Sequence, residues 1–316
     1  MSIFDTTVKV ESVRKVSPSI KEFTLSPVSG ELYPFSPGSH IVVEIPSSEK
    51  LIKNAYSLLS DPWDTRNYKI AVLLQQQSRG GSEYMHENVM VGDELKIAPP
   101  ANFFAPDWRA TKHILIAGGV GITPFMSYLP ELIRREADFE LHYMFRSEFT
   151  GAYKDYLAQY LGEHYFQYDT SNDSRCDISS IFLSRHTGTH FYVCGPESLI
   201  NSVYEIANAS GIPASVIHSE QFSAPKPGDP FEVEIKSTGQ LIVVEAEQSM
   251  LEAMEAAEID VPNLCRGGVC GQCRCQVIAG DIEHRDSYLS GMEKESGSAV
   301  MPCVSRASSQ KIILDL

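Results

Sequence analysis

The feature that most constrains this chain is a cluster of cysteines near its C-terminal end. Of seven cysteines in 316 residues, four lie between Cys265 and Cys275. A disulfide framework spreads its cysteines to join distant loops, whereas a tight group of thiols is typical of a metal site. Thiolate ligands persist in a reducing compartment, so the cluster predicts a metal centre in a cytoplasmic protein.

The spacing of these cysteines indicates the kind of metal centre. Cys265, Cys270 and Cys273 form a C-x4-C-x2-C run, and Cys303 follows after 29 further residues. This is the ligand spacing of plant-type [2Fe–2S] centres, in which three thiolates come from one loop. Glycines in the run let backbone N–H groups approach the cluster sulfides. The alternative, a structural zinc site, tends to use paired C-x2-C units, and only one is present. The extra thiol, Cys275, is expected to be a buried apolar residue.

Charge and hydropathy argue against two classes of partner. The chain has 41 acidic and 26 basic side chains, a net charge of -15. Such a deficit makes nucleic acid and anionic membranes unfavourable partners. The first residues contain no apolar segment of a secretory signal. The uncharged stretch Ile114–Pro130 is interrupted by three glycines and Pro124, which predicts a strand, a loop and a helix rather than a membrane span.

The rhythm of apolar residues divides the chain into three domains and a linker. Residues 1–108 contain short alternating segments separated by proline-rich turns, which predicts an antiparallel β-barrel. Residues 109–222 alternate apolar strands with helical stretches, which predicts a doubly wound parallel α/β sheet. Residues 223–230 are rich in proline and are interpreted as a semi-rigid linker before a third domain, residues 231–316.

Individual elements follow from the same patterns. A Ser249/Glu252 capping box predicts a short helix through Ala257, and Thr123 is expected to cap a helix that has Pro124 at its first position. The expected strands are Thr7–Val13, Lys21–Leu25, Ile41–Ile45, Tyr68–Leu74, His113–Ala117, Phe139–Phe145, Tyr165–Tyr168, His190–Cys194, Phe231–Lys236 and Leu241–Glu245, and the clearest helices are Pro124–Arg135 and Pro196–Ser210.

These motifs together resemble a known family. The last 86 residues resemble a plant-type ferredoxin, which has a β-grasp fold. The whole chain, in the order β-domain, α/β domain and ferredoxin, resembles the phthalate dioxygenase reductase family over residues 7–316. Members of that family pass electrons from NADH through FMN to a [2Fe–2S] cluster and then to a Rieske oxygenase. The resemblance therefore implies NADH, FMN and a [2Fe–2S] cluster as cofactors, and a Rieske-type oxygenase as partner.

Two segments of the first domain indicate the flavin site. Asn54-Ala55-Tyr56-Ser57 resembles the family's R-x-Y-S motif, with asparagine in place of arginine. The resemblance implies that Tyr56 lies against the isoalloxazine ring and that Ser57 bonds to it. The other segment, Arg79-Gly80-Gly81-Ser82, resembles the family's FMN-phosphate turn, where successive N–H groups and an expected helix over Glu83–Val89 favour an anion. Because Asn54 carries no charge, Lys53 or Arg79 is expected to neutralise the phosphate. FMN is favoured over FAD by the family resemblance alone.

Further details resemble one subgroup, the reductase subunits of carnitine-type monooxygenases. They are the NAYSLLS and SRGGS segments, and His284-Arg285-Asp286 shortly before Tyr288. The subgroup implies a carnitine-like trimethylammonium compound as the substrate of the partner oxygenase, and this chain would not bind that compound.

The nicotinamide site is indicated by motifs that resemble those of the ferredoxin reductase superfamily. Gly119, Ile122, Thr123 and Pro124 belong to a GGxGITP motif that opens a helix, whose N-terminus attracts a pyrophosphate. Cys194-Gly195-Pro196 resembles the second nucleotide motif, although a buried strand-end thiol is the plainer interpretation of Cys194. The resemblance also implies roles for Arg146 and Ser147, because residues at these positions contact ribose and adenine in the family. Glu220 and Phe222 resemble the family's E-x-F ending. Phe222 is expected to cover the flavin, and the alternative is a simple core residue.

The choice between NADH and NADPH depends on a few charges. Glu148, Asp169 and Asp173 would repel a 2'-phosphate, whereas Arg146 and Arg175 could hold one. The acids outnumber the bases, so we expect NADH.

The implied reaction needs no side-chain acid or base. A hydride delivers two electrons and an iron–sulfur cluster accepts one, and a flavin can mediate between them. Three alternatives stay open: a reductase for an aromatic-ring dioxygenase or O-demethylase, a reductase for a cytochrome P450, and a non-catalytic electron carrier. The last domain has 14 acids and 7 bases, which predicts docking against a basic surface of the partner.

Overall fold

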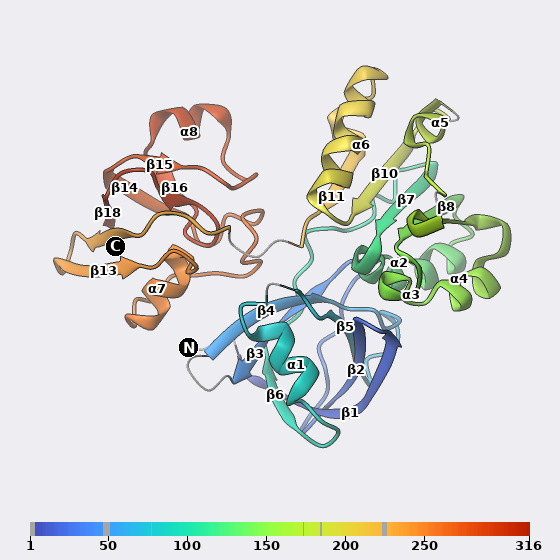
Figure 1. Ribbon diagram of the computed structural model, residues 1–316, viewed down its shortest axis with the longest axis horizontal. Coiled ribbons are helices and arrows are strands. Elements are labelled where there is room, and N and C mark those ends of the chain that lie inside the picture. Colours follow the sequence, from blue (N-terminus) through green and yellow to red (C-terminus); the bar gives the residue numbers. More distant parts are fainter. Residues whose placement is uncertain (1–3, 47–50, 77, 173, 184, 223–225) are drawn as a thin grey trace. The chain divides into compact units, whose positions relative to one another are not determined.

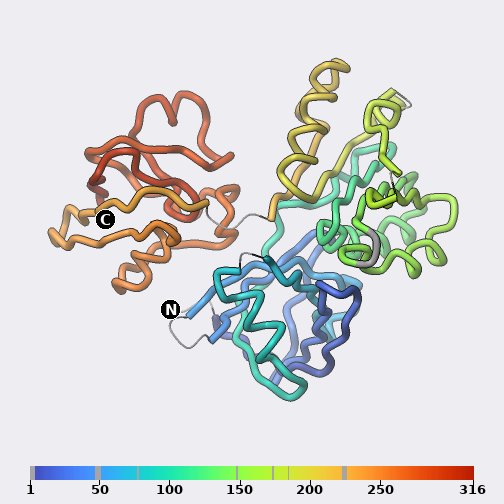
Figure 2. Tube along the Cα trace, in the orientation of Figure 1, coloured from blue at the N-terminus to red at the C-terminus, as the bar shows by residue number. Residues whose placement is uncertain are grey.

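The computed structural model describes residues 4–316 except 47–50, 77, 173, 184 and 223–225, and the side chains of residues 147 and 148 are also not described. The chain forms two compact units, residues 1–222 and residues 223–316. Figure 1 labels the elements of each unit, and Figure 2 follows the same chain as a trace. Among the residues described, no helix is both long and apolar enough to cross a bilayer.

The first unit begins with a six-stranded antiparallel sheet in the order β4-β3-β6-β1-β2-β5. Buried and exposed side chains alternate along its strands, as in the run from Val8 to Glu11, because one face covers an apolar core. The four expected strands are present, and the sequence analysis missed β4 and β6. The elements are β1 (Thr6–Ser17), β2 (Ile20–Pro27), β3 (His40–Pro46), β4 (Leu51–Ser57), β5 (Tyr68–Leu73), α1 (Gly81–Glu87) and β6 (Glu94–Ile97).

A five-stranded parallel sheet completes the first unit, in the order β11-β10-β7-β8-β9. Helices α2 and α4 pack on one face and α5 and α6 on the other, each pair over its own core, which is the doubly wound arrangement expected. The sheet consists of β7 (Lys112–Gly118), β8 (Phe139–Phe145), β9 (Tyr165–Asp169), β10 (Thr189–Cys194) and β11 (Ile217–Glu220), and the helices are α2 (Thr123–Arg134), α3 (Ser147–Thr150), α4 (Lys154–Leu161), α5 (Ile178–Leu183) and α6 (Glu197–Ala209).

The strand order of this sheet locates its binding edge. The chain runs outward from β7 through β8 to β9, then returns to the other side of β7 as β10 and β11. In open α/β sheets, ligands bind beyond the carboxyl ends of the strands where the order reverses. Here that position lies between β7 and β10.

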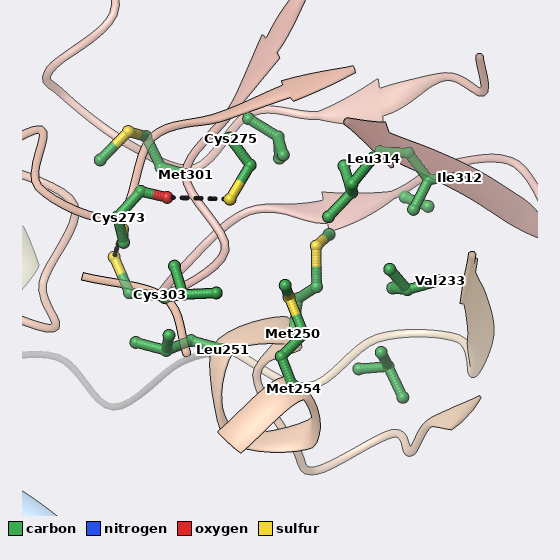
Figure 3. Close-up of a cluster of buried hydrophobic side chains, with 14 of the residues drawn as sticks. Val233, Met250, Leu251, Met254, Cys273, Cys275, Met301, Cys303, Ile312 and Leu314 are labelled. Atoms are coloured by element: carbon green, nitrogen blue, oxygen red, sulfur yellow. Dashed lines mark hydrogen bonds between the residues drawn. The ribbon is translucent and has the colours of Figure 1, made fainter. Parts of the chain in front are cut away.

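The second unit is a mixed sheet in the order β13-β12-β18-β14-β16, with β12 and β18 parallel. Helix α7 contributes Met250, Leu251 and Met254 to its core (Figure 3), and it begins at the expected Ser249/Glu252 capping box. The elements are β12 (Phe231–Ile235), β13 (Gln240–Val244), α7 (Met250–Ala256), β14 (Cys275–Ala279), β15 (Ile282–Glu283), α8 (Gly291–Ser296), β16 (Ala299–Val300), β17 (Arg306–Ala307) and β18 (Lys311–Asp315).

Two arginines hold the described end of the expected linker against the second unit. Arg285 donates to the carbonyl oxygens of Lys226 and Pro227. Arg306 is 2% exposed, and it donates to the carbonyl oxygens of Gly228 and Asp229 at 3.4 and 3.1 Å. The other end of that linker, residues 223–225, lies outside the described residues.

Candidate functional site

The four cysteines predicted as metal ligands converge as two pairs in the second unit. The Sγ atoms of Cys273 and Cys303 are 3.3 Å apart. Cys265 and Cys270 interact strongly enough to shift each other's pKa in opposite directions. Within the described chain, no three His, Cys, Asp or Glu side chains converge as ligands of a single ion. Two thiol pairs suit a two-iron cluster, with two thiolates per iron, better than one tetrahedral zinc ion.

Backbone N–H groups of the loop approach two of these thiols. The backbone N–H of Gly267 donates to Cys265 Sγ at 3.4 Å. A hydrogen bond between the two thiols lowers the pKa of Cys270 to about 6 and raises the pKa of Cys265, and backbone N–H groups act to lower both. Gly271 has a φ of 76°, and a Cβ there would lie 2.2 Å from the Tyr288 ring. The cysteines, the amides and the tight glycine turn therefore fit an anionic iron–sulfur cluster.

The fifth cysteine of the second unit, Cys275, belongs to the apolar core of that unit. It is 2% exposed and packs with the apolar residues of the second unit. Its thiol points at the carbonyl oxygen of Cys273, 3.4 Å away (Figure 3). Burial raises its pKa to about 12. Cys275 is therefore a neutral thiol in apolar surroundings and has the character of a core residue.

In the first unit, the two segments predicted for the flavin meet. Asn54 Nδ2 donates to the Tyr56 hydroxyl at 3.2 Å. A Cβ on Gly81 would lie 2.3 Å from Asn54 Nδ2, so the phosphate turn touches β4. Burial raises the pKa of Tyr56 to about 12, and its phenol stays neutral at physiological pH. A flat apolar ring with a neutral hydroxyl, next to a turn too tight for side chains, fits a flavin.

The turn before α1 is built from backbone and hydroxyl groups. The Ser78 hydroxyl accepts from the Gly80 N–H at 3.1 Å and lies 3.0 Å from the Ser82 hydroxyl. Gly80 has a φ of 98°, and the helix begins at Gly81, two residues earlier than expected. Arg79 is half-buried within the turn. Lys53 instead has its ammonium 5.1 Å from the centre of the Phe4 ring, which favours Arg79 as the cation for a phosphate.

Three residues from different motifs meet where β4, β10 and β11 end. Cys194 and Glu220 are paired across neighbouring strands. Burial raises the pKa of Glu220 to about 8, and the neighbouring Ser57 hydroxyl has a smaller effect that lowers this pKa. Among the described residues, Ser57 Oγ and Glu220 Oε2 are buried without a hydrogen-bond partner of standard geometry. Buried polar atoms left unpaired indicate a missing ligand, so this junction fits the place where flavin and nicotinamide meet.

Both glycine-rich nucleotide motifs lie at the binding edge, packed backbone to backbone. A Cβ on Gly121 would lie 2.1 Å from the carbonyl oxygen of Cys194, and one on Gly118 would lie 2.8 Å from Pro196 Cδ. A Cβ on Gly195 would lie 3.0 Å from Gly118 Cα. These glycines therefore allow the two loops to touch, a packing role that the sequence analysis did not assign.

The predicted cap of α2 is wrong. Thr123 already has helical φ and ψ angles, and the N-cap position belongs to Ile122. The Thr123 hydroxyl donates to the carbonyl oxygen of Val120 at 2.9 Å. The short 3-10 turn Gly119–Ile122 runs directly into the helix, so no extended residue is left to cap it. Pro124, expected at the first position of the helix, is its second residue, because the helix begins at Thr123.

The residues predicted for the adenosine half follow β8 and β9. The N–H of Arg146 donates to the Thr150 hydroxyl at 2.9 Å, a partner that no motif indicated. Asp169 accepts from Ser171 N and Asn172 Nδ2, both at 3.0 Å. Phe145 and Asp169 are paired across β8 and β9, so the two loops are neighbours. Ser147 is the first residue of α3, and its side chain is not described. Phe222 is the last residue of the first unit and is 41% exposed. Asp173 lies outside the described residues.

Two parts of the chain, its middle and its C-terminal part, match models of described families. Residues 233–308 match the 2Fe-2S iron-sulfur cluster binding domain. Residues 94–217 match the N-terminal domain of proteins like DmmA, a dimethylamine monooxygenase subunit.

Similar proteins cover almost the whole chain. The heme-dependent oxidative N-demethylase beta subunit of Ectopseudomonas mendocina is 49% identical over 309 residues, 98% of each chain. The carnitine monooxygenase reductase subunit of Acinetobacter baumannii is 41% identical over 310 residues, 97% of this chain and 96% of its own. The solved structure of phthalate dioxygenase reductase aligns with a TM-score of 0.84 and 30% identity, covering 99% of this chain and 98% of its own. These matches confirm the predicted resemblance and the predicted three-part fold class.

Proposed function

Because this chain belongs to the phthalate dioxygenase reductase family of oxidoreductases, we propose that it passes electrons from NADH through FMN and a [2Fe–2S] cluster to an oxygenase. These cofactors are those of the family. The observation that carries the proposal is the junction of Ser57, Cys194 and Glu220, because residues of the flavin and nucleotide motifs meet there around unpaired polar atoms. When bound, the nicotinamide and the flavin would supply hydride-transfer chemistry, and Ser57, Cys194 and Glu220 would line the place where they meet.

The chain's own residues bind and orient the reactants. When bound, the flavin supplies the conversion of a hydride's two electrons into single electrons. Tyr56 offers a neutral aromatic surface, and Arg79 with the Gly80-Gly81 turn holds the phosphate. Glu220 has a pKa of about 8, so it holds a proton at neutral pH and can donate a hydrogen bond from its carboxyl group. Cys265, Cys270, Cys273 and Cys303 hold the cluster, and the loop's amides stabilise its charge.

The first candidate acceptor is a Rieske oxygenase of the carnitine type. The Asn54-Ala55-Tyr56-Ser57 and Arg79–Ser82 segments are the residues that suggested it, and the 41% identical relative supports it. The substrate of that oxygenase would be a trimethylammonium compound. The chain would act in a reducing cytoplasm, with an acidic second unit that favours a basic docking surface.

A second candidate acceptor is a heme-dependent oxidative N-demethylase. Two observations favour it: the relative with that name is 49% identical over 98% of the chain, and the match over residues 94–217 is to a dimethylamine monooxygenase subunit family. The two candidates share a class of substrate, because carnitine is a trimethylammonium compound and an N-demethylase removes a methyl group from nitrogen. The two differ in whether a Rieske centre or a heme takes the electron.

The test is an anaerobic titration of the holoprotein with NADH, followed by reconstitution. We expect NADH to bleach the flavin and cluster absorbance, and the released flavin to be FMN. Each purified oxygenase is then supplied with this reductase and NADH, and demethylation or hydroxylation is measured. A protein that leaves NADH unoxidised contradicts the proposal. Activity with the heme enzyme alone replaces the first candidate with the second.

A further inference from the structure

The loop that joins β8 to α4, residues 146–153, is held by the antiparallel sheet of the first unit as well as by the parallel sheet to which β8 belongs. We call these residues the β8 loop. The turn between β1 and β2 contributes two hydroxyls to it: Ser17 Oγ donates to the carbonyl oxygen of Phe149 at 2.7 Å, and Ser19 Oγ donates to the same oxygen. Ala152, fully buried, packs in the core of the antiparallel sheet. The loop is therefore attached to both halves of the first unit.

A buried carboxylate completes this attachment. Glu22 on β2 is 8% exposed, and its Oε2 accepts from the Tyr153 hydroxyl at 2.8 Å. Arg14 on β1 donates to both oxygens of Glu22 at 3.1 Å, which fixes the carboxylate and offsets the cost of burying it. Burial and the nearby Glu22 raise the pKa of Tyr153, so its phenol remains a donor.

The backbone of Tyr153 shows that this contact restrains the loop. Tyr153 has a φ of 62° and ψ of 2°, in the left-handed region that side chains other than glycine rarely adopt. Such a conformation is unfavourable for a residue with a side chain and persists only where surrounding contacts hold it. The hydrogen bond to Glu22 and the buried Ala152 on the preceding residue supply those contacts.

The other side of the loop faces the nucleotide motif. A Cβ on Gly119 would lie 3.6 Å from Thr150 Cβ, so Thr150 lies beside the glycine-rich turn. Thr150 accepts from the N–H of Arg146 through its hydroxyl, and its carbonyl oxygen accepts from Tyr143 at 2.8 Å. Thr150 therefore lies between the contacts that the antiparallel sheet makes with the loop and the two features expected to bind the dinucleotide, Arg146 and the glycine-rich turn.

We propose that the β1–β2 hairpin positions the adenosine-binding loop of the nucleotide domain, with Ser17, Ser19, Glu22 and Tyr153 as positioning residues. The inference deepens the proposed function and rests on it, because it needs a dinucleotide bound along the β8 loop. The hairpin holds the loop in the conformation that binds the adenosine half, so it sets dinucleotide affinity without touching the reacting rings.

The experiment compares two substrates of the holoenzyme: NADH, and reduced nicotinamide mononucleotide, which has the same reacting ring and lacks the adenosine half. The variants are Tyr153→Phe, which removes one hydroxyl, and the double variant Ser17→Ala/Ser19→Ala. Ser12→Ala is the matched control, because this β1 hydroxyl bonds to Thr24 within the hairpin and away from the loop. Reduction of ferricyanide gives KM and kcat, and absorbance gives flavin and cluster content.

We expect KM for NADH to rise roughly three- to tenfold in each variant, the effect of losing one or two hydrogen bonds, with kcat little changed. With the mononucleotide, the variants and Ser12→Ala should match the parent protein. An unchanged KM for NADH overturns the proposal, and so does an equal loss with both substrates, since that would show a general effect on the flavin site. If the parent protein oxidises the mononucleotide but shows no preference for NADH, the loop does not bind adenosine. If it oxidises neither, the proposed function itself fails.

Discussion

Glu220→Gln is expected to stabilise the first unit at high pH. The carboxyl group of Glu220 has a buried Oε2 without a standard hydrogen-bond partner among the described residues, and burial raises its pKa from 4.5 to about 8. Glutamine has nearly the same shape and no charge, so the variant removes the titration while keeping the packing. Burial and the charge of Glu220 hold the pKa of Cys194 far above its usual range. In the variant, Cys194 would lose this charged neighbour.

The size of the effect follows from the two pKa values. Between about pH 4.5 and 8 the folded protein keeps a proton that the unfolded chain has lost. The free energy of unfolding therefore falls as the pH rises through this window, and the loss is complete above about pH 8. A shift of about 3.5 units corresponds to at most ~5 kcal/mol, and relaxation of the site would reduce it. About two of these 3.5 units lie between pH 6 and pH 8. The parent protein should therefore lose ~3 kcal/mol of stability in that range, and Glu220→Gln should not.

The assay is urea unfolding of the holoprotein followed by tryptophan fluorescence. Both tryptophans, Trp63 and Trp108, lie in the first unit, so their signal reports that unit alone. We expect the difference in unfolding free energy between variant and parent to grow by a few kcal/mol from pH 6 to pH 9. Ser60→Ala, which removes a buried hydroxyl of the same unit and no ionisable group, is the control. A difference that stays constant across this range would refute the burial argument for Glu220.

Four further outcomes are expected. Cys273→Ser or Cys303→Ser should abolish the cluster absorbance while ferricyanide reduction by NADH continues, and Cys275→Ser should retain the cluster; an iron count that falls in the Cys275 variant would contradict the ligand set. Gly121→Ala should lower the rate of flavin reduction by NADH at least about tenfold, because its Cβ would meet the Cys194 carbonyl oxygen at 2.1 Å, and stopped-flow absorbance measures it. NADH should be preferred over NADPH by at least about tenfold in kcat/KM, and equal efficiencies would show that Arg146 or Arg175 accepts the 2'-phosphate. Electron transfer to the oxygenase should slow as salt rises while ferricyanide reduction changes little, because exposed charges are screened beyond about 8 Å at physiological ionic strength; a flat response would rule out electrostatic docking.

Sequence patterns predicted the strands best where both faces of the sheet are buried. Phe139–Phe145 and His190–Cys194 were expected almost at their observed bounds, because most side chains of these parallel strands are buried and apolar. The missed strands are different. β4 contains Lys53, Asn54 and an exposed Ala55, so it lacks the regular alternation of buried and exposed side chains that sequence analysis depends on.

The candidate site divides in a similar way. The cysteine ligands, the glycine turns and Glu220 could be found because each chemistry fixes a residue type at a fixed spacing. Glu22 and Tyr153 could not be found, because their hydrogen bond joins residues 131 positions apart and neither belongs to a motif. Thr123 illustrates a third case: the residue pattern of a cap was present, but the preceding 3-10 turn took the position that a cap requires.

The arginine contacts in the second unit bear on how electrons leave the first. Arg285 and Arg306 bind the carbonyl oxygens of residues 226–229, so these residues belong to the cluster-containing unit. Phe222, the last residue of the first unit, is then joined to Lys226 by four Cα–Cα steps, which span at most about 15 Å. If residues 223–230 were all free, nine steps would span about 34 Å. The two arginines therefore more than halve the greatest length of chain that can join the two units. The acidic second unit, which carries the four predicted cysteine ligands, is the part that we expect to meet the oxygenase.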